Sequence, residues 1–573
     1  MTRNPRYDIL FEPVRIGPVT AKNRFFQVPH ASGTGCGMPE TRAALREAKA
    51  EGGWGVVCTG YCSIHPSSDD WPLPYCSLWN EADVKAQAVM VEAVHRHGAL
   101  AGVELWHGGS GTTNKFTRVT TMSVSGVSSD LSYPGWMSMT KSRPMDRRDI
   151  REFRRWHVDA AKRARSAGFD IVYIYAGMGF GPYQFLLPWM NKRTDEYGGS
   201  LQNRVRLTRE IVEEMKEAVG QTCAVALRFS TDDLLKVPGE TLQSEAHEIV
   251  TLLSDVPDLW DVKSASWTVE TTSARFCEQG AQETLNSFVK PLTAKPVVGV
   301  GRFTSPDEMV SQIKRGILDL IGAARPAIAD PFLPRKIDEG REDEIRECIG
   351  CNICVSSYHD SVPVRCTQNP TMGEEWRRQW HPERIPPGDP ETSVLIVGAG
   401  PAGLECALAL GQRGFAVTVA EAREELGGRV TIESKLPGLA TWARVRDYRT
   451  NLIQTMSNVA VYRGNPVSAQ DLIDFECDHA VIATGSKWTR EILSTNAYPA
   501  GEIKGATVFT PDDILAGAEP EAPRPPHRGA EFRLARGTCR RESGDTVDPK
   551  YPMPAPSPCI AADQGVRTSR YRN

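Results

Sequence analysis

The chain has 573 residues, of which 40% are hydrophobic and 24% charged, and its formal net charge is -4. This length exceeds what one hydrophobic core supports and predicts a multidomain protein, while the slightly acidic balance excludes the basic surface that nucleic-acid binding needs. No segment reaches the roughly 18 apolar residues of a membrane span, and the first residues show no signal peptide. We therefore expect a cytoplasmic protein that acts on a small molecule.

Short apolar runs alternate with helix-like stretches between about residues 20 and 340. The stretches 81–98 and 149–168 place apolar residues three and four apart and end in Gly, as helices with C-terminal caps do. Eight such strand–helix units predict an α/β fold with a (β/α)8 TIM barrel over residues 1–340, whose chemistry lies at the C-terminal ends of the strands. The predicted strands are residues 23–28, 55–61, 101–106, 169–175, 224–229, 259–265, 296–301 and 318–324.

Four of the 14 cysteines cluster after the predicted barrel with the spacing C-x2-C-x2-C-x11-C. In a reducing compartment this clustering indicates metal binding rather than disulfides. Three Cys at successive two-residue gaps are typical of iron–sulfur sites, whereas zinc sites more often use two separated C-x2-C pairs. We predict an iron–sulfur cluster in residues 341–375, with structural zinc and free thiols as alternatives. The predicted ligands are Cys348, Cys351, Cys354 and Cys366.

The stretch 376–392 is Pro-rich, charged and without periodicity, and is interpreted as a linker. Residues 393–421 then form an apolar strand, a Gly-rich turn, a helix and a second strand that ends in Glu421. A G-x-G-x-x-G turn lets a pyrophosphate approach a helix N-terminus, and the acid can accept a hydrogen bond from a ribose hydroxyl. Residues 393–517 are therefore predicted to be a Rossmann-like dinucleotide-binding domain, with a purely structural unit as the alternative. Its glycines are Gly398, Gly400 and Gly403.

Several motifs together identify a family resemblance. KNRFFQVPH, GVELWHGG, NKRTDEYGGSLQNR and GAARPAIADPFLP occur in the barrel region, and CIGCNIC follows it. Over roughly residues 5–517 the chain resembles the family of trimethylamine, dimethylamine and histamine dehydrogenases and 2,4-dienoyl-CoA reductase. The resemblance implies an FMN-bearing barrel, a 4Fe-4S cluster, and a partial domain that binds FAD or ADP.

The resemblance places FMN at the top of the barrel. It implies that Glu104 and Arg228 meet the isoalloxazine edge, and that Gly turns with Arg side chains after the seventh and eighth strands hold the phosphate. Backbone N–H groups and guanidinium forks suit a phosphate dianion, and these loops are the usual phosphate site of the barrel. The implied phosphate-binding residues are Gly301, Arg302, Gly322 and Arg325.

An aromatic bowl for an amine is also implied. Tyr61, Trp267 and Tyr358 match its positions, with Tyr358 standing where trimethylamine dehydrogenase has Trp. Ring faces attract an alkylammonium ion, which favours a cationic amine as substrate. Tyr175 and Glu270 match the active-site Tyr and its acidic partner, so we expect them to handle the substrate's proton.

Four positions near the flavin depart from the family or leave a role open. Ala31 stands where trimethylamine dehydrogenase has the Cys that links to FMN, so the flavin is expected to be non-covalent. Met178 replaces a His, which takes a basic neighbour away from the active-site Tyr, because Met donates no hydrogen bond. Glu270 stands where trimethylamine dehydrogenase has Asp. His107, in WHGG, is either a partial substitute for the missing His or a structural histidine at a strand end.

The C-terminal part departs most. Relatives continue past the equivalent of Gly517 into a second Rossmann-like domain and return to complete the nucleotide domain. Here residues 518–573 are rich in Pro and Arg without periodicity, so this atypical tail is predicted to be disordered. The nucleotide domain is accordingly expected to be incomplete and to bind FAD or ADP weakly or not at all.

These observations predict an FMN- and 4Fe-4S-dependent oxidoreductase that dehydrogenates a small, methylated or primary amine and passes electrons through the cluster to an external acceptor. By resemblance, that acceptor is an electron-transfer flavoprotein and the enzyme is a homodimer. One alternative is an NAD(P)H-dependent reductase of the enoate or dienoyl-CoA type. The other is a truncated, inactive paralogue that only binds flavin or a partner.

Overall fold

The computed structural model describes residues 2–128, 141–231, 243–264, 274, 276–377, 380–488, 490 and 507–519. The chain divides into two compact units, Met1–Pro386 and Pro387–Asn573. Among the described residues, no helix is both long enough and apolar enough to cross a membrane.

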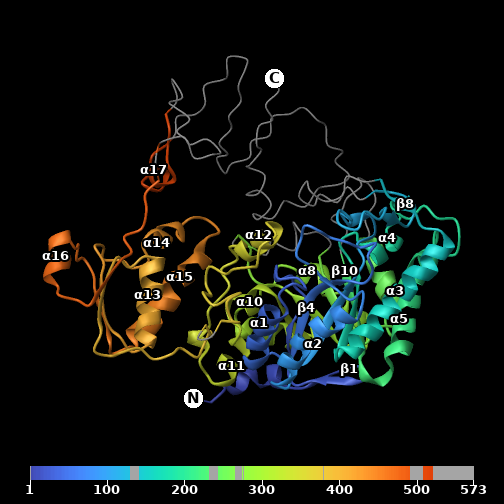
Figure 1. The fold of residues 1–573 in the computed structure, drawn as a ribbon, viewed down its shortest axis with the longest axis horizontal. Coiled ribbons are helices and arrows are strands. Elements are labelled where there is room, and N and C mark those ends of the chain that lie inside the picture. The colour runs from blue at the N-terminus through green and yellow to red at the C-terminus, as the bar shows by residue number, and fades with distance from the viewer. Residues whose placement is uncertain are drawn as a thin grey trace. The chain divides into compact units, whose positions relative to one another are not determined.

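Eight parallel strands of the first unit close into a barrel, because the first of them pairs with both the second and the last (Figure 1). All eight correspond to the apolar runs of the sequence, so the predicted TIM barrel is confirmed. A short strand, β5 (Cys76–Ser77), pairs with the end of the second barrel strand. The barrel strands are β3 (Phe25–Gln27), β4 (Val56–Ser63), β6 (Leu100–Trp106), β9 (Ile171–Ala176), β10 (Ala224–Ser230), β11 (Leu259–Lys263), β12 (Val297–Val300) and β13 (Leu320–Ala323).

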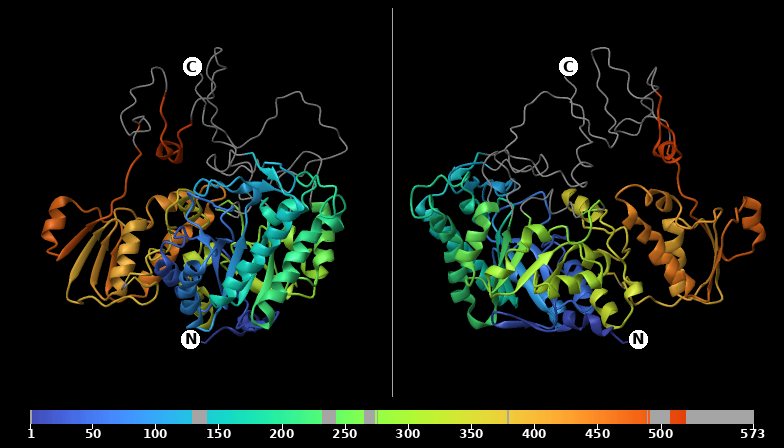
Figure 2. Two further views of the ribbon diagram at one scale, coloured as in Figure 1. Left: turned by 45° about the vertical axis from the view of Figure 1, so that its right-hand side comes forward. Right: turned by 180° about the vertical axis from the view of Figure 1, so that it is seen from behind.

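The strands are apolar on both faces because side chains fill the barrel and helices cover it. Phe26, Cys58 and Tyr173 pack inside, together with Ile16 and Ala21 from an antiparallel hairpin formed by the first two strands. Long helices α3 and α5 lie side by side on the outside of the barrel (Figures 1 and 2). The hairpin and the helices of this unit are β1 (Val14–Ile16), β2 (Val19–Ala21), α1 (Pro39–Glu51), α2 (Glu81–His95), α3 (Arg147–Ser166), α4 (Gly181–Leu186), α5 (Leu201–Val219), α6 (Gln243–Leu253), α8 (Glu283–Asn286), α9 (Pro306–Lys314), α10 (Arg325–Ala329), α11 (Leu333–Asp338) and α12 (Ile353–His359).

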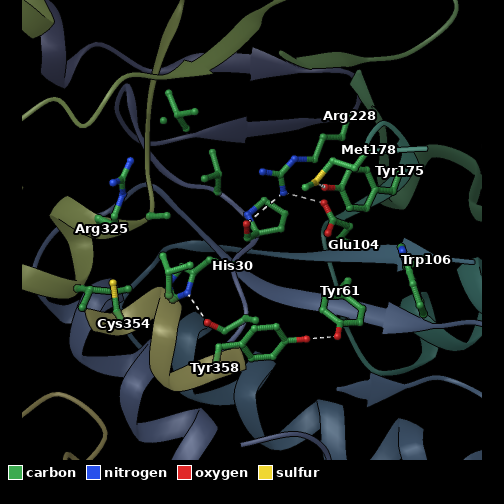
Figure 3. A pocket seen from close by; sticks show the side chains of 18 of the residues that line it. His30, Tyr61, Glu104, Trp106, Tyr175, Met178, Arg228, Arg325, Cys354 and Tyr358 are labelled. Atoms are coloured by element: carbon green, nitrogen blue, oxygen red, sulfur yellow. Dashed lines mark hydrogen bonds and ion pairs between the residues drawn. The ribbon is translucent and has the colours of Figure 1, made fainter. Parts of the chain in front are cut away.

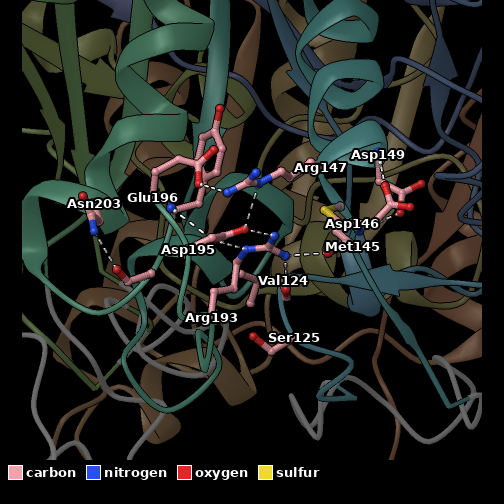
Figure 4. A network of polar contacts seen from close by, with 12 residues as sticks. Val124, Ser125, Met145, Asp146, Arg147, Asp149, Arg193, Asp195, Glu196 and Asn203 are labelled. Carbon is pink, nitrogen blue, oxygen red and sulfur yellow. Dashed lines mark hydrogen bonds and ion pairs between the residues drawn. The ribbon is translucent and has the colours of Figure 1, made fainter.

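The polar motif at residues 191–204 is a structural brace (Figure 4). The largely buried guanidinium of Arg193 pairs with both carboxylate oxygens of Asp195, at 2.9 and 2.5 Å. It also donates to the carbonyl oxygens of Val124 and Met145. The motif thus ties the segment before α5 to the short strands β7 (Met122–Ser123) and β8 (Arg143–Pro144), because the donors of one side chain reach all of them.

The second unit carries a four-stranded parallel sheet in the order β16-β15-β14-β17. One face packs Ile396 against Leu404 and Tyr448 from two helices, and the other packs Leu395 against Leu472. This arrangement confirms a Rossmann-like fold. The elements are β14 (Ser393–Val397), α13 (Pro401–Gln412), β15 (Ala416–Ala420), α14 (Arg429–Glu433), α15 (Arg444–Gln454), β16 (Val459–Tyr462), α16 (Ala469–Asp474), β17 (His479–Ile482) and α17 (Pro511–Leu515). Nearly all of the predicted disordered tail, from residue 520 on, lies outside the described residues.

Candidate active site

A cavity of about 1140 Å³, which includes the solvent at its mouth, opens at the C-terminal ends of the barrel strands. This is the end of a TIM barrel where active sites lie. Most of the predicted flavin and substrate residues line it, which brings together side chains from strands and loops far apart in the sequence. They are Glu104, Arg228, Arg302, Gly322, Arg325, Tyr61, Tyr358 and Tyr175.

A buried ion pair forms one wall of the cavity (Figure 3). Arg228, on β10, donates from Nη1 to Glu104 Oε2 at 2.7 Å and to the Pro29 carbonyl oxygen at 3.1 Å. Breaking a buried pair is costly, so each side chain holds the other in place. The pair offers both donors and an acceptor at the cavity wall. Those are the groups that the pyrimidine edge of an isoalloxazine requires.

Two arginines line the cavity near the cysteine segment. Arg302 donates from Nη1 to the Cys348 carbonyl oxygen at 3.0 Å, and Arg325 donates to Asn352 Oδ1 at 2.7 Å. Arg302 is 6% exposed, and its Nε–H has no hydrogen-bond partner among the described residues. An unpaired buried donor costs about 1–3 kcal/mol, so this atom fits an anionic ligand such as the phosphate of FMN.

The glycines predicted for the phosphate site are required by packing. A Cβ at Gly322 would lie 2.6 Å from the Gly299 carbonyl oxygen, and one at Gly301 would lie 2.9 Å from the Gly280 Cα. Gly322 lines the cavity, whereas Gly301 does not. Gly301 instead precedes Arg302, which lines the cavity and has a φ of +56°.

The opposite wall carries the rings of Tyr61 and Tyr358 (Figure 3), and the carboxyl group of Asp70 lines the cavity beside them. Tyr61 donates to Asp70 Oδ2 at 2.7 Å, and the hydroxyls of Tyr61 and Tyr358 are hydrogen-bonded to each other. The Tyr61 ring lies 4.9 Å from that of Trp106 and 6.3 Å from that of Tyr358. Asp70 is 2% exposed, its Oδ1 has no partner among the described residues, and burial raises its pKa to about 7. Sequence reasoning missed this carboxyl group, which follows β4 in the run SSDD.

Tyr175 has a basic neighbour that the sequence did not reveal. Its hydroxyl donates to Met178 Sδ at 2.8 Å, because the Met sulfur can only accept a hydrogen bond. The same hydroxyl oxygen accepts from Lys263 Nζ at 3.2 Å. Met178 thus removes the His at that position, as expected, but another basic side chain lies beside Tyr175. The sequence signal was present: Asp261 and Lys263 are two residues apart in an otherwise apolar strand, so both point to the same face of β11.

The other predicted proton-handling and bowl residues are not part of the described cavity. His107 does not line it; its Nδ1 accepts from the Gly109 N–H at 3.1 Å, and its Nε2 bonds Ser67 Oγ at 2.9 Å. Burial lowers the pKa of His107 well below its usual value, so the ring is neutral, and the geometry supports the structural interpretation. Trp267 and Glu270 lie outside the described residues.

Ala31 lines the cavity, so the position that carries a flavin-linking Cys in trimethylamine dehydrogenase has no thiol here. The nearby Cys36 does not line the cavity. Its sulfur instead accepts from the Ser77 N–H at 3.2 Å.

The four predicted cluster ligands are close enough to interact electrostatically with one another. Backbone N–H donation to sulfur, common around iron–sulfur clusters, occurs from Gln368 to Cys366 Sγ at 3.3 Å. Within the described part of the chain, no group of three or more His, Cys, Asp or Glu side chains could hold a single metal ion. Cys354 also lines the barrel cavity.

The Gly-rich turn of the second unit has the geometry of a pyrophosphate site. Gly398 has a φ of +100°, and a Cβ at Gly403 would clash with the Gly398 carbonyl oxygen, whereas a Cβ at Gly400 would meet nothing within 4 Å. No side chain caps the N-terminus of α13. The close packing at Gly403, the open space at Gly400 and the uncapped backbone N–H groups at the start of α13 together fit a bound pyrophosphate. Both oxygens of Glu421 already accept backbone N–H groups, from Ala399 at 2.7 Å and from Arg423 at 3.0 Å, and each can accept one more hydrogen bond.

Comparisons with known proteins agree with this architecture. Residues 9–344 match the NADH:flavin oxidoreductase / NADH oxidase family, and residues 392–516 match the pyridine nucleotide-disulphide oxidoreductases. Dimethylamine dehydrogenase from Hyphomicrobium sp. (strain x) is 42% identical over 531 residues, which cover 90% of this chain and 72% of that protein.

Two solved structures are also similar. A 6-hydroxypseudooxynicotine amine oxidase from Pseudomonas geniculata N1 has 50% identity and a TM-score of 0.87, over 91% of this chain and 77% of that one. Histamine dehydrogenase from Rhizobium sp. 4-9 has 47% identity and a TM-score of 0.86, over 90% and 75%. The chain therefore belongs to the NADH:flavin oxidoreductase / NADH oxidase family and is a flavin-dependent oxidoreductase.

Proposed function

We propose that this enzyme dehydrogenates a small amine that binds as a cation, with FMN in the barrel cavity and a 4Fe-4S cluster on the four cysteines. The carboxyl group of Asp70 carries the proposal: it lines the same cavity as the Glu104–Arg228 pair, behind the aromatic ring of Tyr61. Dimethylamine dehydrogenase and histamine dehydrogenase among the relatives support an amine over the enoate-reductase alternative.

The charges of the cavity orient such a substrate. Tyr61, Trp106 and Tyr358 present ring faces or edges, and each ring face can add ~0.5–2 kcal/mol to the binding of a cation. Asp70 adds a full negative charge once it is ionised. On the opposite wall the charge of Arg228 is already paired with Glu104, so the wall with the aromatic rings and Asp70 is the side that attracts an ammonium group.

The flavin site is built for non-covalent FMN. Glu104 and Arg228 would hold its ring edge, Arg302 and Arg325 would hold its phosphate, and Ala31 offers no linking thiol. When bound, FMN supplies a two-electron acceptor that takes hydride from the carbon next to the amine nitrogen.

A protonated amine has no lone pair to assist hydride loss, so one proton must leave nitrogen before or during the transfer. Tyr175 lines the cavity and is the residue that takes this proton. Loss of one proton and one hydride converts the ammonium ion to an iminium ion. Water then hydrolyses the iminium ion to an aldehyde and a smaller amine.

The cysteine segment would carry the electrons onward. Cys354 lines the flavin cavity. Arg302 and Arg325 line it too, and both donate hydrogen bonds to residues of the cysteine segment. A cluster on this segment would therefore lie next to the flavin site. By resemblance, the acceptor would be an electron-transfer flavoprotein, and the enzyme a cytoplasmic homodimer. The turn at Gly398–Gly403 supports a further site for FAD or ADP.

Anaerobic stopped-flow mixing of the purified holoenzyme tests the proposal. Flavin absorbance is followed against methylamine, dimethylamine, trimethylamine, histamine, NADH and NADPH. Bleaching by at least one amine at a rate faster than that by the nicotinamides is expected. Bleaching by NADH or NADPH alone would overturn it, and so would a photoreducible flavin that no compound bleaches.

A further inference from the structure

Lys263 is fully buried at the end of β11, next to the active-site tyrosine. Its Nζ donates to the Tyr175 hydroxyl oxygen at 3.2 Å and lies 5.6 Å from the centre of that ring. Lys263 is not among the described residues that line the cavity, whereas Tyr175, which it contacts, does line it.

We propose that Lys263 is a positioning residue that holds the Tyr175 oxygen ready to accept the substrate's proton. This inference rests on the proposed function for the identity of the substrate, but not for the state of Tyr175. The ammonium group stabilises the phenolate form of Tyr175 and orients its oxygen through a charge-assisted hydrogen bond. Position 178 holds Met, so no basic side chain there can stabilise the Tyr175 phenolate. Lys263, from β11, supplies this positive charge instead.

The proton balance of the step is simple. The Tyr175 phenolate takes one proton from the ammonium nitrogen of the substrate, which leaves a neutral amine and a phenol. The Lys263 ammonium stays protonated throughout and gives up no proton. The phenol then returns its proton to water when the product leaves.

The other groups around Tyr175 act on its protonation state in different directions. Arg228, from β10, lies 5.3 Å from the ring centre and adds a second positive charge. Glu104, from β6, is bonded to Arg228 at 2.7 Å, which limits its effect on Tyr175. Met178 brings no charge, but its Sδ accepts the Tyr175 hydroxyl hydrogen at 2.8 Å and so favours the neutral phenol. The buried carboxyl group of Asp261, on β11, lies 3.9 Å from Arg228 Nε. Lys263 is the cation that contacts the Tyr175 oxygen itself, and its charge is therefore the one that favours a negatively charged oxygen at this position.

The first test does not depend on any amine. Tyrosine labelled with 13C at Cζ is incorporated into the protein, and the Tyr175 resonance is assigned by its loss in Tyr175→Phe. In Lys263→Met, which keeps the packing but removes the charge, the midpoint of the Tyr175 titration is expected to rise by about one to three pH units. Lys263→Arg, which keeps a cationic donor, is expected to recover most of this shift.

The second test uses the amine that reduces the flavin fastest. The pH midpoint of flavin reduction is expected to shift in the same direction and by the same amount in Lys263→Met. In the Tyr175→Phe background the same substitution is expected to leave the pH profile unchanged, because the group it acts through is gone. Lys49→Met is the matched control: Lys49 is also fully buried, but its Nζ donates to the Leu45 carbonyl oxygen, away from Tyr175.

The outcomes separate the two proposals. An unshifted Tyr175 resonance in Lys263→Met, or an equal shift in Lys49→Met, overturns the role of Lys263. A shifted resonance in an enzyme whose flavin no amine reduces supports the role of Lys263 and overturns the amine as substrate.

Discussion

Tyr61 donates its hydroxyl hydrogen to Asp70 Oδ2 at 2.7 Å, and this bond fixes a buried carboxyl group behind an aromatic ring of the active-site cavity. The hydroxyl of Tyr358 bonds that of Tyr61, so a chain of three side chains runs along the wall. Its far end, Asp70 Oδ1, has no partner among the described residues. A cation in the cavity is the species that would relieve the cost of charging Asp70.

Asp70→Asn is expected to weaken the binding of a small ammonium ion about 10- to 150-fold, the loss of ~1.5–3 kcal/mol from one charge-assisted hydrogen bond. Because burial raises the pKa of Asp70 to about 7, the wild-type carboxyl is neutral below that pH and charged above it. Affinity of the wild type should therefore rise as pH increases through about 7, and affinity of the variant should not change with pH. Flavin difference spectra with tert-butylammonium measure this, because that ion stays protonated and has no hydrogen on the carbon next to nitrogen.

The neighbouring Asp69→Asn is the control. Asp69 accepts from the backbone N–H groups of Trp71 and Phe116 and does not line the cavity. Its substitution should lower the melting temperature and keep affinity dependent on pH, but with the midpoint at lower pH, because the charge of Asp69 helps to raise the pKa of Asp70. An unchanged pH dependence in Asp70→Asn would rule out Asp70 as the titrating group.

Arg302→Met is expected to raise the dissociation constant for FMN by about 10- to 150-fold, because the guanidinium would lose charge-assisted hydrogen bonds to the phosphate. Riboflavin has no phosphate, so its affinity should change little. Fluorescence titration of the flavin-free protein with both flavins gives the comparison. Arg315→Met, which removes an exposed Arg bonded to Glu283, is the control. Equal losses for FMN and riboflavin would show that Arg302 supports the fold rather than the phosphate.

Gly400→Ala and Gly403→Ala should separate binding from folding in the second unit. A Cβ at position 400 meets nothing within 4 Å, so this variant should fold normally but lose adenine-nucleotide affinity, since the methyl group occupies the space of the pyrophosphate. A Cβ at position 403 clashes with the Gly398 carbonyl oxygen, so that variant should unfold at lower temperature. Calorimetric titration with ADP and thermal unfolding measure the two effects. Unchanged ADP affinity in Gly400→Ala would contradict a site at this turn.

Cys366→Ala is expected to abolish the visible absorption and the iron content of the cluster while FMN content is retained. Cys366 is one of the four interacting thiols, and the residue does not line the flavin cavity. Cys406→Ser, in the second unit, should change neither. Iron, zinc and flavin analysis of anaerobically purified protein provides the measurement, and stoichiometric zinc in the wild type would contradict the cluster.

Local patterns were sufficient for the architecture. Each barrel strand is a short apolar run buried on both faces. The glycine spacing from Gly398 to Gly403 also predicts a pyrophosphate-binding turn, because such a backbone must turn and approach a ligand within a few residues. The spacing of the four cysteines likewise predicts a shared site from neighbouring positions.

The chemistry of the cavity was decided by tertiary structure. Asp70 bonds Tyr61 from the segment that follows the same strand, nine residues away, whereas Lys263 on β11 reaches Tyr175 on β9, 88 residues away. In sequence, a Lys at the end of a strand is usually a solvated charge, and Asp–Asp in a loop is usually a turn. What the sequence determined by itself was which elements form and which cofactors they suit. Which charges lie beside Tyr61 and Tyr175 depends on the tertiary structure, because folding buries Asp70 and Lys263 next to these two rings.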